Sequence, residues 1–409
     1  MNIYFSGISG TALAPLALLA THAGHQVFGS DLAQGAAADE LAEQGLDTHY
    51  GPQDGIFLKK QFTEKGIDWF VYTSALPSDH TELQLAKQLG IKKITKRDAL
   101  LSEIIATNHL KLVAIAGTHG KTTTTAMLIW TCHQLSIPIS YSVGSTLPWA
   151  KSGDFNPSAQ YFIYEADEYD RNFLHFHPQI SLITTEDYDH TDTYPTRESY
   201  HQAFAQFRAQ SDTVIENTPE IPSITLVGEL RRKDASLAFQ ALKLISNTND
   251  VSIIAALNTF PGAGRRFEKL TDNIYSDYAH HPQEISATLK MARELVDQSG
   301  FASLTILYQP HQNTRQHEIL SAYHNAFDQA DQILWLPTYL TREDPNLSIL
   351  APKDFIATLS NPQKATAVDL NDSLIQTLSD LTAQNHLILL MSAGPADPWL
   401  RNAIKNPPK

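Results

Sequence analysis

The 409-residue sequence has only one cysteine and comparatively few basic residues. Cys132 cannot form an internal disulfide, so nothing in the sequence indicates an oxidising compartment. The 30 lysines and arginines are outnumbered by 44 acidic residues, which gives a formal net charge of −14 at pH 7, and no stretch is dense in lysine or arginine. We therefore expect neither a nucleic-acid partner nor a membrane-surface partner.

Long apolar runs are missing as well. No stretch approaches the roughly 18 apolar residues of a membrane-spanning helix. The first residues, MNIYFSGISG, have neither the basic region nor the apolar region of a signal peptide. We therefore expect a cytoplasmic protein.

Along the whole chain, apolar runs of strand length alternate with short turns and helical periods. This alternation is typical of parallel sheets built from β-α-β units, so the predicted fold class is α/β. This alternation of strands and helices begins anew at three places in the chain, which predicts three domains at residues 1–107, 108–266 and 267–409. Strands are predicted at residues 2–6, 27–29, 111–116, 161–164, 180–184, 274–276, 304–308, 332–336, 365–368 and 387–391.

The most specific motif lies at residues 117–123, between a predicted apolar strand and a predicted helix. Glycines allow backbone N–H groups to close around phosphate oxygens, a lysine binds the β and γ phosphates, and a hydroxyl binds Mg²⁺. Ile115 stands where the general pattern has glycine, so this loop is a variant form. The motif predicts a nucleoside triphosphate site made of Gly117, Thr118, His119, Gly120, Lys121, Thr122 and Thr123.

Two acidic clusters, residues 165–170 and 187–192, each follow a predicted strand. The carboxyl ends of parallel strands line the ligand crevice of an open sheet, so both clusters should lie beside the phosphate loop. Carboxylate and imidazole groups at such a place can hold a divalent cation. Either cluster alone would more often be a solvated turn; their pairing beside the loop favours a metal site.

Two further kinds of segment follow predicted strands, and a pair of arginines comes just before the third predicted domain. The turn at residues 7–12 suits a second phosphate group, although it lacks the second glycine of the dinucleotide fingerprint, and a plain tight turn is the alternative. Residues 277–282, 309–311 and 392–395 predict a ligand crevice on a later sheet, with a capped helix as the alternative for the last of them. The pair Arg265-Arg266 could face a triphosphate or be ordinary surface charge.

Taken in order, these segments resemble the Mur ligase family, the three-domain, ATP-dependent, amide-forming ligases of peptidoglycan synthesis. The resemblance covers nearly the whole chain. It implies a Rossmann-like first domain for the uridine diphosphate part of the substrate, a P-loop ATPase-like middle domain for ATP, and a Rossmann-like third domain that binds the amino acid and closes over both. The combination GTHGKTTTT, EADE, DHTDTY, RRFE, DYAHHP and QPHxxTR most resembles the alanine-adding members.

The resemblance also implies roles for single residues. Lys121 would bind phosphate, Thr122 one Mg²⁺, and Glu165 with His190 another. The implied catalytic residues are Lys121, Glu165, His190, Arg266 and Asp277. The implied substrate-binding residues are Gly7, Ser9, Gly10, Ser74, Tyr278, His280, His311 and Arg315. The expected small molecules are ATP with Mg²⁺, UDP-N-acetylmuramate and L-alanine, and the expected oligomeric state is a monomer or homodimer.

The sequence departs from the family in three places. Only 74 residues separate His190 from Arg265, which makes the middle domain short. Leu230, Arg231 and Asp234 replace the histidine and both asparagines of the family's Gly-x-His-Asn-x-x-Asn-Ala box, which carries the usual adenine contact. An ionised Asp234 would only accept hydrogen bonds, so we predict weak discrimination between ATP and GTP.

Gln312 stands where the alanine-adding members carry an arginine. A ligase that adds a whole tripeptide to the same UDP-sugar therefore stays open as an alternative. So does a non-catalytic nucleotide-binding relative. The full set of phosphoryl-transfer residues argues against this second alternative, because a binding module would not need it.

Overall fold

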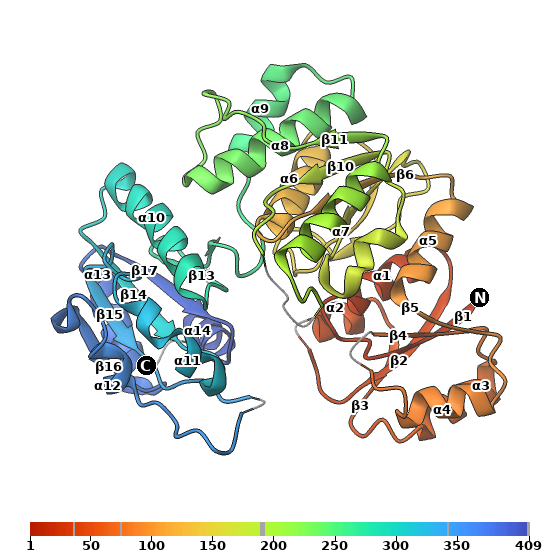
Figure 1. The fold of residues 1–409 in the computed structure, drawn as a ribbon, viewed down its shortest axis with the longest axis horizontal. Coiled ribbons are helices and arrows are strands. Elements are labelled where there is room, and N and C mark those ends of the chain that lie inside the picture. The colour runs from red at the N-terminus through yellow and green to blue at the C-terminus, as the bar shows by residue number, and fades with distance from the viewer. Residues whose placement is uncertain (36, 74–75, 189–192, 342, 407–409) are drawn as a thin grey trace. The chain divides into compact units, whose positions relative to one another are not determined.

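The structure is a computed structural model that describes residues 1–35, 37–73, 76–188, 193–341 and 343–406. Three sheets of mostly parallel strands follow one another along the chain (Figure 1), so the predicted α/β class is confirmed. The chain divides into two compact units, which are described separately. One unit is Met1–Thr225 with Leu230–Phe260, and the other is Leu226–Glu229 with Pro261–Lys409.

The first sheet has five parallel strands in the order β3-β2-β1-β4-β5. The strand order reverses between β1 and β4, and ligands of open α/β sheets bind beyond the strand ends at such a point. The strands are β1 (Asn2–Ser6), β2 (Gln26–Asp31), β3 (Asp47–Tyr50), β4 (Trp69–Tyr72) and β5 (Lys93–Lys96). The helices are α1 (Leu13–His22), α2 (Ala38–Glu43), α3 (Ile56–Lys65), α4 (Thr81–Gln88) and α5 (Arg97–Thr107).

The second sheet has the order β11-β10-β6-β9-β7-β8, and only β8 runs antiparallel to its neighbour. Strand β6 lies between β9 and β10, so the segments that follow these three strands share one edge. The strands are β6 (Lys111–Ala116), β7 (Ile139–Ser142), β8 (Gly153–Asp154), β9 (Tyr161–Glu165), β10 (Ile180–Ile183) and β11 (Thr213–Ile215). The helices are α6 (Lys121–Gln134), η1 (Tyr169–His175), α7 (Arg197–Ala209), α8 (Glu229–Ile245) and α9 (Asp250–Asn258).

One hydrophobic core connects the first two sheets. Ile3 and Phe5 of β1 belong to the same buried cluster as Phe162 and Tyr164 of β9. Tyr4, which points to the other face of β1, packs into a separate cluster. The shared core explains why the first two sheets form a single compact unit.

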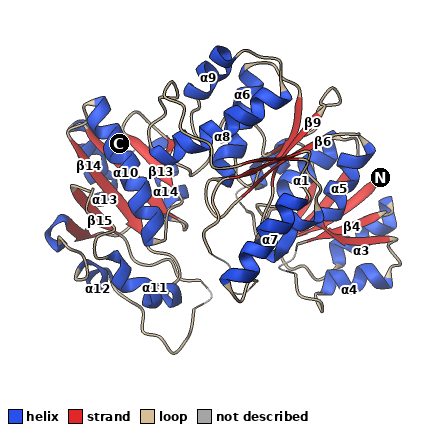
Figure 2. Cartoon of the chain, turned by 45° about the horizontal axis from the view of Figure 1, so that its top comes forward, coloured by secondary structure: helices blue, strands red, loops and turns tan. Residues whose placement is uncertain are grey.

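The third sheet has the order β12-β13-β17-β14-β15-β16, and only β12 is antiparallel to its neighbour. Figure 2 shows β13, β14 and β15 with α10 beside them. The strands are β12 (Glu268–Lys269), β13 (Ile274–Asp277), β14 (Ser303–Gln309), β15 (Gln332–Trp335), β16 (Ala365–Ala367) and β17 (His386–Ser392). The helices are α10 (Pro282–Ser299), α11 (Asn313–Ile319), η2 (Leu320–Tyr323), α12 (Pro352–Ile356), η3 (Pro362–Lys364), α13 (Asp372–Ala383) and α14 (Ala396–Lys405).

Both faces of this third sheet are buried, as is typical of parallel strands. Leu389 of β17 packs with α10 in one core, whereas its neighbour Leu390 packs with α13 and α14 in another. Helix α10 begins with Pro282 in its first turn, and Glu284 completes a capping box. No helix in the described part of the chain is long and apolar enough to cross a membrane.

Candidate active site

The phosphate loop has the predicted context of strand, loop and helix. Strand β6 ends at Ala116, and α6 begins at Lys121. Gly117 and Gly120 have φ angles of +141° and +85°, which side chains rarely adopt. A Cβ on Gly117 would lie 2.1 Å from the hydroxyl oxygen of Thr184, so only glycine lets the loop pack against the end of β10.

Part of the loop is held by the segment that follows β10. The backbone N–H of Thr118 donates to the carbonyl oxygen of Thr185 at 3.1 Å, and the N–H of His119 donates to the Thr185 hydroxyl at 2.8 Å. The Thr118 hydroxyl donates to the carbonyl oxygen of Asp187 at 2.6 Å. These contacts fix the shape of the loop, and they leave the unpaired first-turn amides of α6 as the backbone donors that a phosphate can use.

Lys121 is paired with Glu168, a residue that the sequence did not single out. The Lys121 ammonium lies 2.7 Å from one carboxylate oxygen of Glu168 and donates to the carbonyl oxygen of Gly117 at 2.6 Å. The Glu168 side chain is fully buried. Its place in the cluster at 165–170 was visible in the sequence, but its pairing with Lys121 was not. A phosphate that binds Lys121 competes with this carboxylate.

Thr122 and Glu165 lie together, as the metal-site prediction requires. The Thr122 hydroxyl donates to one Glu165 oxygen at 2.9 Å, and the other oxygen accepts the Gly144 N–H at 2.9 Å. Hard oxygen donors of this kind fit Mg²⁺ beside phosphate oxygens. The predicted ligand His190 lies outside the described residues, as does the predicted substrate residue Ser74. Within the described ranges, no three His, Cys, Asp or Glu side chains could by themselves hold a metal ion.

We expect Glu165→Ala to raise the Mg²⁺ concentration required for half-maximal activity, because the cation loses a carboxylate ligand. Titration of activity with Mg²⁺ at saturating ATP measures this effect. Asp170→Ala is the matched control, since Asp170 belongs to the same acidic cluster but pairs with Lys96 at the surface. An unchanged titration in Glu165→Ala and in His190→Ala would mean that both clusters are merely solvated turns.

A cavity of about 150 Å³ lies beside the phosphate loop in the first unit. Thr11 and Ala12 of the N-terminal turn line it together with Lys121 and Glu165. The structure thus brings the two predicted phosphate-binding segments to one space. The remaining lining residues are Arg97, Ser142, Val143, Gly144, Tyr164 and Asp167.

The turn at residues 7–12 is only partly available to a ligand. The N–H groups of Gly7 and Gly10 donate to the carbonyl oxygens of Ser30 and Gly7, at 2.8 and 3.1 Å. Both the N–H and the hydroxyl of Ser9 donate to the Asp31 carboxylate, at 2.9 and 2.7 Å. The tight-turn alternative therefore accounts for these amides, and the end of the turn at Thr11 and Ala12 is the part that faces the cavity.

The segment that replaces the adenine box forms the start of α8. Asp234 is buried there, and a Cβ on Gly120 would lie 2.6 Å from one of its carboxyl oxygens. Burial raises the pKa of Asp234 from its ordinary value of 3.8 to about 8, although the charge of Arg231 opposes the shift. The assumption that Asp234 is ionised is therefore wrong at neutral pH. A protonated carboxyl group both donates and accepts hydrogen bonds.

In the second unit, three predicted rings lie in a row at the edge of the third sheet. The centroids of Tyr278 and His280 are 5.5 Å apart, and those of His280 and His311 are 5.8 Å apart. The guanidinium of Arg266 lies 5.5 Å from the Tyr278 ring. Burial lowers the pKa of both histidines, and the positive charge of Arg315 adds to the effect, so both rings are neutral at pH 7.

Asp277, the last residue of β13, is buried. Its two carboxylate oxygens accept the N–H groups of Phe267 and Ala279, at 2.7 and 2.8 Å. Burial raises its pKa. Asp277 thus ties the segment that carries Arg266 to the end of β13, which is a positioning role.

The turn at residues 392–395 has a structural explanation. The side-chain oxygen of Gln309 accepts the N–H of Ala396, the first residue of α14, at 3.1 Å. The Ser392 hydroxyl donates to the same oxygen at 3.0 Å. The capped-helix alternative therefore accounts for this turn.

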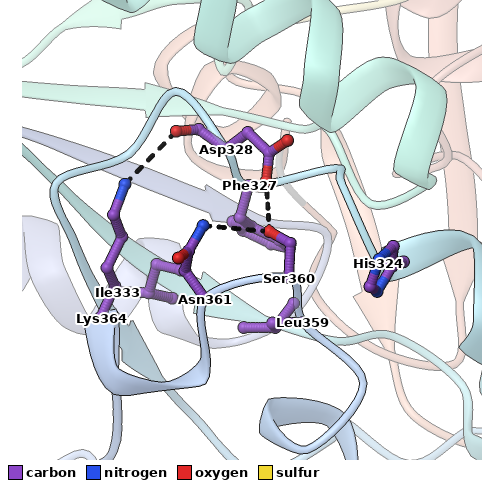
Figure 3. Close-up of a pocket in the computed structure, with 8 residues that line it drawn as sticks. All are labelled: His324, Phe327, Asp328, Ile333, Leu359, Ser360, Asn361 and Lys364. Carbon is purple, nitrogen blue, oxygen red and sulfur yellow. Dashed lines mark hydrogen bonds between the residues drawn. The ribbon is translucent and has the colours of Figure 1, made fainter.

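Figure 3 shows a small hollow between η2, η3 and β15 in the second unit. Ser360 and Lys364 donate there to the side chain and the backbone of Asp328. Its volume of about 10 Å³ accommodates about one water molecule. None of the predicted site residues lines it, so it is not a substrate site.

Comparison with known proteins identifies two family domains in the chain. Residues 2–109 match the Mur ligase family catalytic domain, and residues 115–219 match the Mur ligase middle domain. A UDP-N-acetylmuramate--L-alanine ligase of Fusobacterium nucleatum is 30% identical over 85% of both chains. One from Clostridium perfringens is 28% identical over 96% of this chain and 95% of its own.

Two solved structures share the fold. UDP-N-acetylmuramate-alanine ligase MurC from Thermotoga maritima aligns with a TM-score of 0.79 at 21% identity, over 99% of this chain and 98% of its own. A murein peptide ligase from Psychrobacter arcticus aligns with a TM-score of 0.61 at 22% identity, again over 99% and 98%.

Proposed function

Because the chain belongs to the Mur ligase family, we propose that it is an ATP-dependent ligase that joins the carboxylate of UDP-N-acetylmuramate to L-alanine in peptidoglycan precursor synthesis. The observation that carries this function is the cavity that Thr11 and Ala12 share with Lys121 and Glu165. It puts the end of a turn suited to a nucleotide-linked substrate next to a phosphate loop. Phosphoryl transfer needs this proximity.

A free carboxylate is a poor acyl donor, because its leaving group would be an oxide. Transfer of the γ-phosphoryl group of ATP to the carboxylate gives an acyl phosphate and ADP. The amine then attacks the acyl carbon, loses a proton, and expels inorganic phosphate to leave the amide. Lys121 neutralises charge on the transferred phosphoryl group, and the loop backbone orients it. Water would hydrolyse the acyl phosphate, so this chemistry requires a site that excludes water.

The proposed function includes Mg²⁺, which would neutralise phosphate charge when bound. Thr122, Glu165 and His190 would hold it. We assign the first two sheets to substrate and ATP domains at residues 1–107 and 108–266, and residues 267–409 to the amino-acid domain. In that last domain, Tyr278, His280, His311 and Arg315 would bind substrate, with Arg266 on the ATP side. The use of ATP supports action in the cytoplasm.

Phosphate release with UDP-N-acetylmuramate and a panel of amines tests the function. Release with L-alanine that depends on all three substrates is expected. ATP binding without release for any amine would favour the non-catalytic alternative. Because Lys121 and Glu165 line the same cavity and Thr122 is hydrogen-bonded to Glu165, we expect turnover.

We expect a higher kcat/KM for L-alanine than for a γ-linked tripeptide, since His311 and Arg315 stand as in the alanine-adding members. Gln312 is the residue that differs, and it has a positive φ of 65° with its N–H bonded to the carbonyl oxygen of Tyr339 at 2.8 Å. Gln312→Arg is therefore the companion variant, and the ratio of the two kcat/KM values is the measurement. A ratio in favour of the tripeptide would make the recycling ligase the better assignment.

A further inference from the structure

Arg97, the first residue of α5, has no part in the function derived so far. Its side chain is 15% exposed and lines the same cavity as Lys121 and Thr11. Arg97 belongs to the first sheet's helices, whereas Lys121 follows a strand of the second sheet. The cavity is therefore bordered by a cation from each of the two sheets.

Most hydrogen-bonding capacity of Arg97 is unused within the described part of the chain. A guanidinium has five N–H donors, and its one described bond joins Nη2 to a carboxylate oxygen of Asp167 at 3.0 Å. The other oxygen of Asp167 accepts the Tyr169 N–H at 3.1 Å, which holds this carboxylate in its own loop. Arg97 can thus keep its contact with Asp167 and still donate to a second anion in the cavity.

We propose that Arg97 binds the carboxylate of the acceptor substrate and holds it beside Lys121 for phosphoryl transfer. This inference rests on the proposed function, which requires that carboxylate to reach the phosphate loop. The planar fork of a guanidinium matches two carboxylate oxygens, which an ammonium group cannot do. The diphosphate of the same substrate presents similar anionic oxygens, so the experiments must separate the two groups.

The first experiment compares Arg97→Ala and Arg97→Lys with Lys96→Ala. Lys96 is the matched control, because it precedes Arg97 and pairs with Asp170 of the same acidic cluster, but its side chain is 43% exposed. We expect Arg97→Ala to raise the KM for UDP-N-acetylmuramate at least about tenfold and to leave the KM for ATP unchanged. Arg97→Lys should recover only part of this loss. A KM for UDP-N-acetylmuramate within about twofold of the wild-type value in Arg97→Ala would overturn the proposal.

Asp167→Ala separates substrate binding from a purely structural ion pair, because it removes the acceptor of the Arg97 bond. If Arg97 acts only by holding α5 to Asp167, then Arg97→Ala and Asp167→Ala both lose this contact and should show the same defect. If Arg97 binds the substrate, Asp167→Ala frees its guanidinium, and the KM for UDP-N-acetylmuramate should stay at or below the wild-type value. The proposal would be overturned if both variants lowered thermal stability equally and raised this KM equally.

Binding measured by calorimetry without turnover identifies the anion. UDP-N-acetylglucosamine carries the same diphosphate but lacks the lactyl carboxylate, so Arg97→Ala should bind it as the wild type does while binding UDP-N-acetylmuramate more weakly. Equal weakening for both ligands would overturn the carboxylate assignment in favour of the diphosphate. Failure of the wild type to release phosphate with L-alanine would contradict the proposed function, but the binding comparison would still decide the role of Arg97.

Discussion

Lys121→Ala is expected to lower kcat/KM for ligation by about 10³-fold or more, because the transferred phosphoryl group loses the positive charge that stabilises it in the transition state. Lys121 is the ammonium that reaches both the phosphate loop and the cavity. Phosphate release at saturating UDP-N-acetylmuramate and L-alanine measures the effect. Turnover within about tenfold of the wild-type value would contradict the assignment of the loop.

The buried partner of Lys121 decides how this variant must be controlled. Removal of the ammonium breaks its ion pair with the fully buried Glu168 carboxylate, and loss of one partner of a buried ion pair is strongly destabilising. Lys121→Ala with Glu168→Gln removes both charges and should recover the lost stability without recovering activity. Unfolding by urea together with the activity assay distinguishes a catalytic defect from a folding defect.

The strands that the sequence predicts are those with continuous apolar runs, and all ten are present with ends that differ by at most two residues. In the first sheet, β4 was missed although its sequence, WFVY, is apolar. The edge strands β3 and β5 were missed because their sequences, DTHY and KITK, are short and polar. Their place follows from pairing with β2 and β4. Local sequence carries little information about such pairing.

Some features of the site could be predicted from the sequence, and others could not. That Glu165 lies next to the phosphate loop follows from the rule that neighbouring parallel strands end at one edge, and the pairing of β6 with β9 satisfies it. The place of Arg97 beside Lys121 depends on how the first two sheets pack, and no spacing in the sequence reports that packing. The protonation of Asp234 likewise depends on its burial, which only the folded chain defines.

Asp234 should make the nucleotide preference depend on pH. With its pKa raised to about 8, the carboxyl group is mostly protonated at pH 7 and offers one donor and one acceptor, as the asparagine of the family does. Adenine presents a neighbouring donor and acceptor, whereas guanine presents two acceptors at the corresponding edge. One matched hydrogen bond contributes about 1 to 1.5 kcal/mol, so ATP should be preferred over GTP by about tenfold at pH 7. This preference lies at the upper limit of the weak discrimination expected from the sequence, and its cause is a protonated carboxyl group instead of an ionised one.

The raised pKa of Asp234 also makes the free energy of unfolding depend on pH. Between pH 4 and pH 8 the folded chain keeps the Asp234 proton and the unfolded chain has lost it, so this group makes the free energy of unfolding fall as pH rises through that range. Above about pH 8 the folded chain also loses the proton, and this group no longer lowers the free energy of unfolding further as pH rises. Asp234→Asn has no proton to lose, and its stability relative to the wild type should therefore increase from pH 5 to pH 8.

Both consequences are measured on one pair of proteins. The ratio of kcat/KM for ATP to that for GTP should decline in the wild type as pH rises from 7 to 9, because an ionised Asp234 can only accept hydrogen bonds. In Asp234→Asn the ratio should stay constant, since the amide offers a donor and an acceptor at every pH. Suppose that the wild-type ratio is constant over this range and that the stability of Asp234→Asn relative to the wild type does not change from pH 5 to pH 8. Asp234 would then be ionised in the folded chain. A constant ratio with the expected unfolding profile would mean that Asp234 is protonated but another segment reads the base.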